Sequence, residues 1–540
     1  MPQFINSTQS LVTEALNGIL RTQPLSVLDG YPHIKVVHRQ QLDRSRVALV
    51  SGGGSGHEPA HAGFVGAGLL AAAVCGEVFA SPSVEAVLAA IMAVTGDAGC
   101  LLIVKNYTGD RLNFGLAAER AKAEGKKVEM VVVGDDIALP DLPQPRGVAG
   151  TLFVHKIAGY MAEQGESLDA IFKAASEVAN AARSYGVALD NCTVPGNKKD
   201  DRVPRGKAEL GLGIHGEPGV QTIDFTDAAS LASTLVQNLM AGQSCDQVML
   251  LNNLGNTTPL EMQVMLNALL QAPDSALIKH VVGPAQLMTS LDMHGVSVSM
   301  LPARAPWVAA LQAPVACAAW PGCDSVSSID VQPMPKNITV TVEVASHDEQ
   351  LSALINDSCD AFMAMLADLN ALDAKTGDGD TGTTVASAAR SLKSSIDKLP
   401  LADSAQLFRA MSDQLSVSMG GSSGVLLAIL FSAASDAART GKGDIMALRE
   451  GLTRMMNYGG AELGDRTMVD ALLPALDSLI SDGDIQAAAL AARAGAQSTS
   501  TMTRARSGRS AYVPAASLQG VTDPGAEAVA RFFEMLVTRA

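Results

Sequence analysis

The sequence of 540 residues is short of cysteines, aromatic residues and long apolar runs. Its seven cysteines are scattered, at positions 75, 100, 192, 245, 317, 323 and 359. No pair has the spacing of a zinc knuckle, and such a dispersed set is typical of reduced thiols in a cytosolic protein. The most apolar stretch, 64–74, is soon followed by Glu77 and is shorter than the about 20 residues that a bilayer span requires. Because no basic region precedes an apolar one at the start, we expect no signal peptide, and we predict a cytoplasmic protein outside the membrane.

Basic runs and the common phosphate-binding motifs are also missing. The net charge is −16 and no short run is rich in lysine and arginine, so the chain would repel the phosphates of nucleic acids. Gly-Lys occurs at 125–126, 206–207 and 441–442 but never before Ser or Thr, so the G-x-x-x-x-G-K-[ST] loop is absent. The protein-kinase motifs are absent too. We expect no nucleic-acid partner, and any nucleotide site must be of a less common type.

The first part of the chain, up to about residue 325, alternates between short apolar runs and helical patterns. The predicted strands lie at 47–50, 100–104, 128–133, 248–251 and 296–300. Strands separated by helical stretches favour parallel sheets covered by helices, with ligands at the carboxyl ends of the strands. We therefore expect an α/β domain over 1–330, rich in parallel sheet and divided into two subdomains near 185–205.

From about residue 347 onward the strand-like runs vanish and helical patterns follow one another. We predict eight helices, at 349–371, 382–397, 403–418, 424–439, 444–457, 467–481, 484–503 and 524–539. In the third of these, Leu407, Met411 and Leu415 are spaced by four residues and would share one face. We therefore expect an all-α domain over 346–540.

The segment 321–343 separates the two patterns. Its prolines at 321, 333 and 335 disfavour a helix, and 338–344 alternates apolar and polar residues as an extended segment would. We read this segment as an interdomain connection and place the linker at 331–345.

Two predicted strands lead into segments that could bind a ligand. SGGGSGHEPAH at 51–61 includes the run of glycines, and KNYTGD at 105–110 follows the next strand. Glycines let a ligand approach the backbone, free N–H groups can hold oxygens, and His57 could exchange protons near neutral pH. The alternatives are a tight strand-to-helix turn capped by His57 and a helix start capped by Thr108 or Asp110.

The segment GLGIHG at 211–216 fits the dinucleotide pattern G-x-G-x-x-G. No clear strand is predicted before it, and Pro218 stands where a helix should begin, which argues against a nicotinamide oxidoreductase. An accessible neutral imidazole is a nucleophile, so His215 could add to a carbonyl carbon. The alternative is a histidine that is hydrogen-bonded within a loop.

The segment LDAKTGDGDTGTT at 372–384 brings three carboxylates within eight residues: Asp373, Asp378 and Asp380. Such hard oxygen ligands suit Mg²⁺, and the helix start at Thr383 offers N–H groups to an anion. An EF-hand is excluded because its ligand pattern is absent. The alternative is an acidic loop between two helices.

Several other segments of the all-α half open or close a helix. They are 420–424, 465–468, 508–509 and 523–525. If the eight helices form a closed bundle, these ends could converge at one rim. Taken singly, each of them is explained equally well as the start or end of a helix.

Taken together, the segments resemble the ATP-dependent dihydroxyacetone kinases over nearly the whole chain. The matching segments, in order, are SGGGSGHEPAH (51–61), GEVFASPS (76–83), KNYTGDRLNF (105–114), ELGLGIHGEPG (209–219), LDAKTGDGDTG (372–382), MGGSSGVL (419–426), GDRTMVDAL (464–472) and DPGA (523–526). The segment 313–321 follows no pattern of the family that we recognise.

The resemblance implies an architecture and partners. It implies a substrate-binding K region fused to a nucleotide-binding L region, with the L region folded as a barrel of eight antiparallel helices. Fusion of the two in one chain is similar to the members that exchange free ATP. The resemblance also implies a homodimer in which the K and L domains of different chains face each other. It implies dihydroxyacetone and ATP as ligands, and two Mg²⁺ ions in each active site.

The resemblance also implies residue roles. His215 resembles the histidine that forms a covalent hemiaminal with the ketone, and His57 and Asp110 resemble the acid/base pair beside the reacting hydroxyl. The substrate-contacting positions would be Gly54, Ser55, Gly56, His57, Lys105 and Asp110. The Mg²⁺ ligands would be Asp373, Asp378 and Asp380. The nucleotide-contacting positions would be Thr381, Gly382, Thr383, Thr384, Ser422, Ser423, Gly459, Met468, Arg509, Asp523, Pro524 and Gly525.

Three alternatives to a dihydroxyacetone kinase remain open from the sequence. The first is a kinase for glyceraldehyde or for a four-carbon ketose such as erythrulose, because the pocket behind His215 cannot be sized. The second is a non-catalytic sugar sensor, which would have no need for the three aspartates. The third is a nicotinamide oxidoreductase, which depends on the weak pattern at 211–216 alone. A lyase side activity that releases cyclic flavin phosphate from FAD is also open, because some animal relatives resemble such a lyase. The sequence also leaves open which of His57 and Asp110 is the base, and whether transfer occurs within or between chains.

Overall fold

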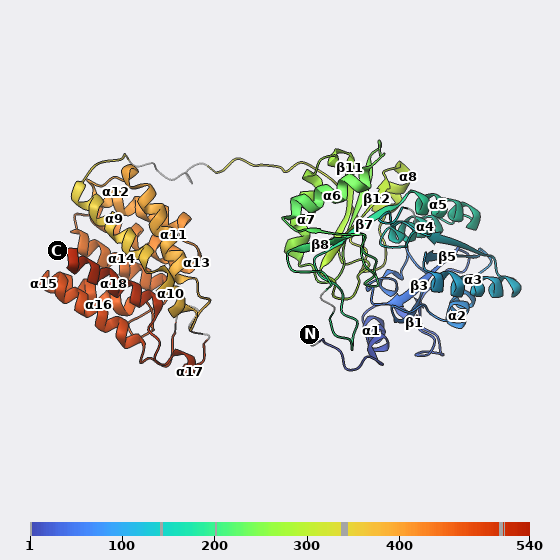
Figure 1. Ribbon diagram of the computed structural model, residues 1–540, viewed down its shortest axis with the longest axis horizontal. Helices are drawn as coiled ribbons and strands as arrows, with labels where there is room; N and C mark the ends of the chain where they lie inside the picture. The colour runs from blue at the N-terminus through green and yellow to red at the C-terminus, as the bar shows by residue number, and fades with distance from the viewer. Residues whose placement is uncertain are drawn as a thin grey trace. The chain divides into compact units, whose positions relative to one another are not determined.

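The computed structural model describes residues 3–140, 144–199, 202–335, 344–506, 511 and 513–539. The chain divides into two compact units, Met1–Asp330 and Val331–Ala540 (Figure 1). The first, which we call the α/β unit, contains two β-sheets with helices on their faces. The second, the helical unit, has helices and no named strand among its described residues. The two fold classes predicted from the periodicity are confirmed.

The first sheet of the α/β unit has six strands in the order β1-β2-β4-β3-β5-β6. The strands are β1 Leu25–Val27, β2 Val36–Arg39, β3 Ala48–Ser55, β4 Ala72–Val78, β5 Cys100–Lys105 and β6 Val128–Val133. The neighbours β4, β3, β5 and β6 are parallel, as predicted. In the pair β5 and β6, Cys100 lies opposite Val128 and Lys105 opposite Val133. The carboxyl ends of these strands therefore meet at the same end of the sheet.

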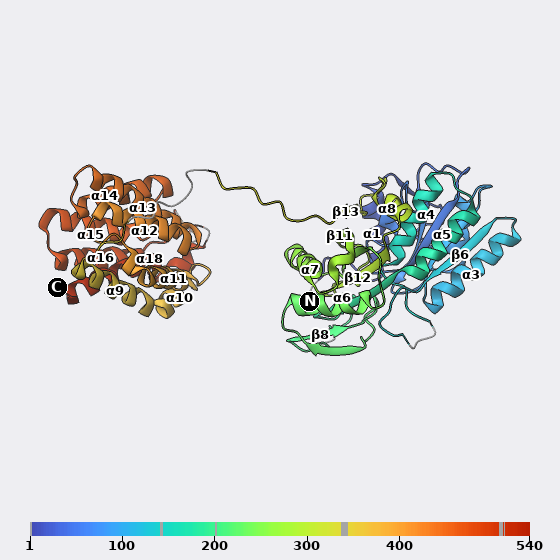
Figure 2. The ribbon, with the colours of Figure 1, turned by 90° about the horizontal axis from the view of Figure 1, so that it is seen from above.

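Helices cover both faces of the first sheet. α2 (Val84–Val94) and α3 (Thr108–Ala123) pack on the face that carries Val50 and Leu102. α4 (Thr151–Glu163) and α5 (Leu168–Ala181) lie side by side on the face that carries Leu49 and Leu101 (Figure 2). Successive residues of a strand point to opposite faces, so a strand covered on both sides requires a continuous apolar run.

The second sheet has seven strands in the order β13-β11-β10-β12-β7-β8-β9. The strands are β7 Arg183–Ala188, β8 Lys207–Leu210, β9 Gln221–Asp224, β10 Gln247–Asn253, β11 Ile278–Ala285, β12 Gly295–Pro302 and β13 Cys323–Ser325. Here the parallel arrangement that we predicted holds only for β10 and β11, which α7 (Pro259–Gln271) connects. β10 and β12 are antiparallel, with Met249 opposite Met300. No helix joins β11 to β12, and a parallel connection needs such a crossover.

The second sheet shares a helical layer with the first. Val248 and Leu250 of β10 belong to the apolar cluster that also contains the core residues of α4 and α5. Met249 and Leu251, on the opposite face, pack with α6 (Ala228–Met240) and α7. The chain leaves the first sheet with α5 and enters the second at β7, so the change of sheet falls at about Ala182. This is just ahead of the break that we expected near 185–205.

The glycines that we expected at the end of the strand lie within β3 itself. A Cβ atom at Gly52 would lie 2.2 Å from the carbonyl oxygen of Val74 on β4, and one at Gly54 would lie 2.7 Å from the backbone nitrogen of Ala80. Only glycine permits the backbones to approach so closely. β3 therefore continues to Ser55 with its last residues pressed against the segment that follows β4.

The helical unit is a closed ring. Its helices are α9 Glu349–Ala364, α10 Leu366–Asp373, α11 Thr381–Ser394, α12 Ser404–Ser418, α13 Gly421–Arg439, α14 Asp444–Gly459, α15 Val469–Asp482, α16 Ile485–Thr499, α17 Ala515–Leu518 and α18 Pro524–Arg539. Neighbouring long helices pack along the chain, and α18 packs back on α9 and α10 to close the ring. The eight predicted helices are present, but the first is interrupted at Met365 and the short α17 was not foreseen.

By length and composition alone, α13 could cross a membrane: it has 19 residues and a mean hydropathy of 1.4. No other described helix passes this test. In the ring, Leu430 of α13 packs with Leu452 of α14, and Ser435 donates a hydrogen bond to the carbonyl of Ala405 on α12. The apolar character of α13 thus supplies the contacts that hold it between α12 and α14.

The segment between the units begins later than 321. Cys323–Ser325 forms β13, which pairs with β11, so the start of the expected connection 321–343 belongs to the second sheet. Residues 326–335 are exposed and have no regular structure. The extended stretch expected at 338–344 lies outside the described residues except for Val344.

We expect the fragments 1–330 and 346–540 to fold independently. Each apolar cluster of described residues lies within one unit, so cutting the chain between them exposes no core. Expressed separately, each fragment should show a cooperative thermal unfolding transition by circular dichroism. A fragment that lacks such a transition, while the intact chain shows one, would contradict this division.

Candidate functional site

The α/β unit brings the predicted substrate residues together where β3 and β5 end. Lys105 is the last residue of β5, and Asp110 lies in the first turn of α3. Both are buried. A Cβ atom at Gly53 would lie 2.5 Å from Lys105 Nζ and 3.4 Å from Asp110 Oδ2, so both charged groups rest against the strand backbone. Because Gly53 has a φ of +151°, in a region that favours glycine, a side chain there would be both strained and obstructed.

Three rings form a triangle beside this point. The centroids of His57 and His215 are 4.9 Å apart, and Phe79 lies 5.2 Å from the first and 5.1 Å from the second. Tyr107 packs edge-on against His215 at 4.5 Å. Phe79 has a φ of +57°, a conformation that is costly for a bulky residue and that persists only where the surroundings enforce it. The two predicted catalytic imidazoles are thus held in contact by aromatic side chains that our sequence analysis did not single out.

His57 is neutral and has one nitrogen available. Its Nδ1 donates a hydrogen bond to the carbonyl of Thr289 at 2.8 Å, which leaves Nε2 with the lone pair. Nε2 is buried and has no hydrogen-bond partner among the described residues. Burial, together with the nearby Lys105 and His215, holds the pKa of His57 well below its usual value. A buried, unpaired acceptor is costly unless a ligand supplies the missing donor, so His57 is suited to face a substrate hydroxyl.

The loop that carries His215 is a hairpin connection. Contrary to our expectation, a strand does precede it: β8 ends at Leu210, and β9 follows at Gln221. The two strands are antiparallel and no helix begins at Pro218, so the dinucleotide reading fails on geometry. His215 Nδ1 lies 3.1 Å from Glu217 Oε1.

A second set of buried groups lies behind the predicted substrate site. Lys105 Nζ donates a hydrogen bond to His61 Nε2 at 2.8 Å, and His61 Nδ1 in turn lies 3.0 Å from His155 Nε2 on α4. Burial, with a further contribution from Lys105, lowers the pKa of His155 to about 3. Lys105 is therefore held by a neutral histidine pair that fixes the position of its ammonium group.

At the other predicted substrate positions, polar groups already form hydrogen bonds within the protein. Ser55 donates its hydroxyl to the carbonyl of Gly76 at 2.8 Å, and the backbone N–H of Gly56 donates to Glu58. Gly54 packs against the backbone that follows Phe79. These three residues contact other parts of the protein, whereas His57, Lys105 and Asp110 carry the buried titratable groups of the predicted site.

The three predicted metal ligands lie together in the helical unit. One carboxylate oxygen from each of Asp373, Asp378 and Asp380 falls within 4.8 Å of the other two. Asp373 is buried at the end of α10, where its Oδ2 accepts the backbone N–H groups of Asp380 and Thr381 at 3.0 and 3.1 Å. These bonds fold the loop so that the three side chains converge. An all-oxygen set of this kind fits Mg²⁺, which retains waters and is completed by phosphate oxygens.

The predicted nucleotide-contacting residues that the structure describes all lie at helix ends. They are at the start of α11 (Thr381, Gly382, Thr383, Thr384), the start of α13 (Ser422, Ser423), the last residue of α14 (Gly459), the residue before α15 (Met468) and the start of α18 (Asp523, Pro524, Gly525). Two contacts join parts of this set. A Cβ atom at Gly525 would lie 3.4 Å from that of Met468, and one at Gly459 would lie 3.0 Å from the Leu426 side chain of α13. Arg509 lies outside the described residues.

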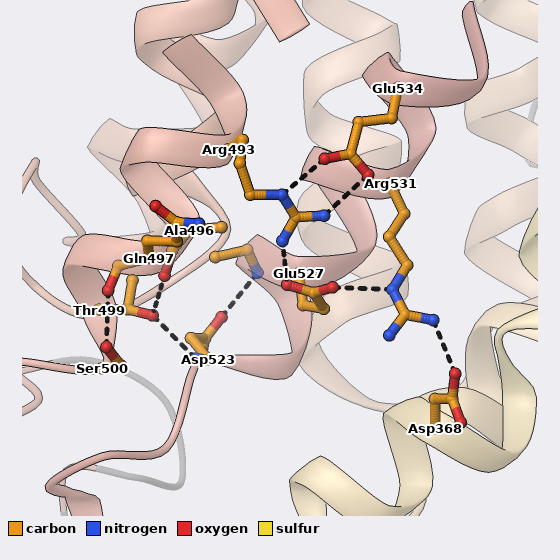
Figure 3. A network of polar contacts seen from close by, with 11 residues as sticks. Asp368, Arg493, Ala496, Gln497, Thr499, Ser500, Asp523, Glu527, Arg531 and Glu534 are labelled. Atoms are coloured by element: carbon orange, nitrogen blue, oxygen red, sulfur yellow. Dashed lines mark hydrogen bonds and ion pairs between the residues drawn. The ribbon is translucent and has the colours of Figure 1, made fainter. Parts of the chain in front are cut away.

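A polar network fixes the start of α18 relative to the helix that carries Asp373 (Figure 3). Arg531 donates to Glu527 at 2.7 Å and to Asp368 of α10 at 2.8 Å. Arg493 of α16 donates to Glu527 as well, and Asp523 receives a hydrogen bond from Ala526 N–H at 2.9 Å. These contacts join α10, α16 and α18, the helices next to the predicted metal loop and the predicted nucleotide loop.

Four residues near the predicted substrate site were not foreseen as functional: Phe79, Tyr107, His61 and Glu217. All of them stand inside the segments that carry the family resemblance. The hydroxyl of the partly exposed Tyr107 is buried without a partner among the described residues, which a single sequence does not reveal. A histidine followed two residues later by a glutamate, as in 215–217, was the one signal available.

Two family models match the chain: a Dak1 domain over residues 17–319 and a DAK2 domain over 375–538. The chain therefore belongs to the dihydroxyacetone kinase family, in the form that fuses a Dak1 and a DAK2 domain in one polypeptide. This confirms the resemblance carried by the motifs.

Named relatives cover the full length. The dihydroxyacetone kinase of Citrobacter freundii is 46% identical over 555 aligned residues, covering 99% of this chain and 98% of the relative. A putative 3,4-dihydroxy-2-butanone kinase of Solanum lycopersicum is 41% identical over 577, covering 98% and 97%. The crystal structure of the C. freundii enzyme in complex with AMP-PNP and Mg²⁺ matches with a TM-score of 0.74 at 44% identity, over 100% of both chains.

The buried histidine behind Lys105 should make the stability of the protein depend on pH. The folded His155 stays neutral down to about pH 3, whereas an unfolded histidine takes up a proton below about pH 6.5. The unfolded state therefore binds the extra proton, and stability falls as the pH drops from about 6.5 towards 3. When the pH is lowered from 7 to 5, this histidine should reduce the free energy of unfolding by about 2 kcal/mol.

Urea unfolding at pH 7 and pH 5 measures this effect. His155→Gln should reduce the loss of stability between the two pH values by about that amount. The exposed His33→Gln is the control and should leave the loss unchanged. An equal loss in His155→Gln and the parent would contradict the assignment.

Proposed function

We propose that the chain transfers the γ-phosphoryl group of ATP to dihydroxyacetone, giving dihydroxyacetone phosphate and ADP in the cytoplasm. The observation that carries the proposal is the packing of the buried His57 against the partly buried His215, with ring centroids 4.9 Å apart. Among the described residues His57 Nε2 has no hydrogen-bond partner, and Lys105 lies nearby. The name of the C. freundii relative and its AMP-PNP and Mg²⁺ complex support the same acceptor and donor.

Capture of the substrate is proposed to be covalent. A triose has few atoms, and even the best small ligands gain only about 1.5 kcal/mol for each non-hydrogen atom. A reversible bond from His215 Nε2 to the ketone carbon would fix the orientation that hydrogen bonds alone leave loose. It would also reject glycerol, which has no carbonyl group.

Proton removal is proposed to occur at the terminal hydroxyl of the captured ketone. His57 Nε2, which has no hydrogen-bond partner in the described parts of the chain, and the carboxylate of Asp110 are the two groups proposed to accept this proton. Lys105, held against Gly53 by His61, places a positive charge beside them. Gly54, Ser55 and Gly56 shape the wall of the pocket.

The helical unit is proposed to hold the phosphoryl donor. Asp373, Asp378 and Asp380 would bind two Mg²⁺ ions, which bridge phosphate oxygens and neutralise charge in phosphoryl transfer. The helix ends listed above, from Thr381 to Gly525, would hold the nucleotide, and Arg509 would neutralise charge on the leaving diphosphate. A non-catalytic sugar sensor would need none of these groups, which argues against that alternative.

The substrate range is a proposal with a second candidate. The name of the S. lycopersicum relative specifies a four-carbon ketone, so a four-carbon ketone is the acceptor to compare with dihydroxyacetone. The same ketone capture would serve both. We also propose a homodimer in which the helical unit of one chain serves the α/β unit of the other, on the strength of the family resemblance.

The proposal divides the tasks between the two units, and variants of each should fail differently. Asp380→Ala should abolish ATP turnover while dihydroxyacetone still adds its mass to the protein. His215→Ala should lose that adduct while the binding of Mg·ATP is retained. Intact-protein mass spectrometry and nucleotide titration measure the two effects. Loss of the adduct in Asp380→Ala would point instead to a single composite site.

The same variants test the homodimer. Chains carrying His215→Ala and Asp110→Ala are co-expressed with Asp380→Ala chains, so that mixed dimers form. Recovery of kinase activity by two inactive parents is the expected result, because each chain retains the unit that the other has lost. Confirmed mixed dimers without activity would defeat transfer between chains.

A further inference from the structure

The turn 215–217 places a carboxylate directly on the proposed nucleophile. Glu217 Oε2 accepts the backbone N–H of His215 at 2.8 Å, and Oε1 lies 3.1 Å from His215 Nδ1. Gly216, with a φ of +77°, makes the bend that returns the glutamate to the histidine. A Cβ atom at Gly213 would lie 2.2 Å from Glu217 Oε2, so a larger residue there would force the carboxylate to move.

The carboxylate stays ionised in this position. Burial by itself would raise the pKa of Glu217, but the hydrogen bonds from the side chain and backbone of His215 outweigh it and lower the pKa to about 2. An ionised carboxylate can only accept hydrogen bonds, so the proton of a neutral His215 must sit on Nδ1. The lone pair is then on Nε2.

We infer that Glu217 is the positioning residue that holds His215 in the Nδ1–H tautomer and so makes Nε2 the nucleophile for the ketone. The inference rests on the proposed capture by His215. As the Nε2–C bond forms, the carbonyl π bond breaks and its electron pair moves to oxygen. The imidazole becomes a cation whose Nδ1–H faces Glu217. Movement of one proton from Nδ1 to the alkoxide, through solvent, gives the neutral hemiaminal without an oxidant or a reductant.

The loop itself is anchored from the other side by Arg146. Its NH2 donates to the carbonyl of Gly211 at 2.7 Å, and the same guanidinium pairs with Asp136 at 2.7 Å. Arg146 therefore fixes the start of the segment 211–217, while Glu217 fixes its end on His215. A loop held at both points keeps the imidazole in place before the substrate arrives.

Histidine labelled with ¹⁵N in the full-length enzyme tests the inference without substrate. Nitrogen chemical shifts distinguish a protonated from an unprotonated ring nitrogen, and the signal of His215 is identified by its loss in His215→Ala. The parent should show a protonated Nδ1 and an unprotonated Nε2. In Glu217→Gln the single acceptor oxygen cannot serve both the His215 backbone and Nδ1, so the Nε2–H tautomer should become populated.

Kinetics supply the functional readout. Glu217→Gln should raise the KM for dihydroxyacetone about tenfold or more, a change worth about 1.4 kcal/mol, and leave the KM for ATP unchanged. Glu217→Asp, which keeps the charge, should recover part of the loss. The matched control is Glu261→Gln, which alters another histidine–glutamate pair, to His294 at 2.9 Å, and should change neither constant.

The outcomes separate this inference from the proposed function. An Nε2–H tautomer in the parent, or the same nitrogen pattern in the parent and Glu217→Gln, overturns the role of Glu217. A shifted tautomer with an unchanged KM for dihydroxyacetone overturns it as well. The expected nitrogen pattern in a parent enzyme that forms no adduct with dihydroxyacetone would refute the capture itself, and with it the purpose assigned to Glu217.

Discussion

The close packing of β3 on its neighbours is the constraint on which the candidate substrate site depends. Gly52 and Gly54 leave no room for a side chain against β4 and the segment after it, and Gly53 leaves none against Lys105. A Cβ at Gly53 would lie 2.5 Å from the Lys105 ammonium group, so the ammonium group would have to move. These three glycines of β3 have no side chains, so the neighbouring backbones can approach closely. Because of this, the charged groups of Lys105 on β5 and Asp110 on α3 both lie next to Gly53.

The helical unit solves a different problem, that of gathering like charges. Three carboxylates within 4.8 Å repel one another, so the structure must hold them in place until a cation compensates. Asp373 accepts hydrogen bonds from the N–H groups of the loop that carries Asp380. Arg531, which contacts both Asp368 and Glu527, joins α10 to α18. Hydrogen bonds within the loop and ion pairs farther along α10 therefore oppose the repulsion among the three carboxylates.

Much of this could be predicted from the sequence, and the omissions have physical causes. The uninterrupted apolar runs predicted β3, β5 and β6, and the helical periodicity after residue 347 predicted the helical unit. The spacing of the three aspartates predicted that they would lie together, as they do. The composition of β12 did not reveal that it runs antiparallel to β10, because an apolar run is compatible with either orientation. Phe79 and Glu217 were missed because their roles depend on backbone conformation, a positive φ at Phe79 and at Gly216, which a single sequence does not reveal.

The most direct test of the whole account is ADP release by the purified full-length protein with Mg·ATP and one acceptor at a time. We expect release to require a short ketone, with dihydroxyacetone accepted and glycerol rejected, because the proposed capture by His215 requires a carbonyl group. Comparison with glyceraldehyde and erythrulose then sets the substrate range. ADP release at the same rate with glycerol as with dihydroxyacetone, or none with any of these acceptors, would contradict the account.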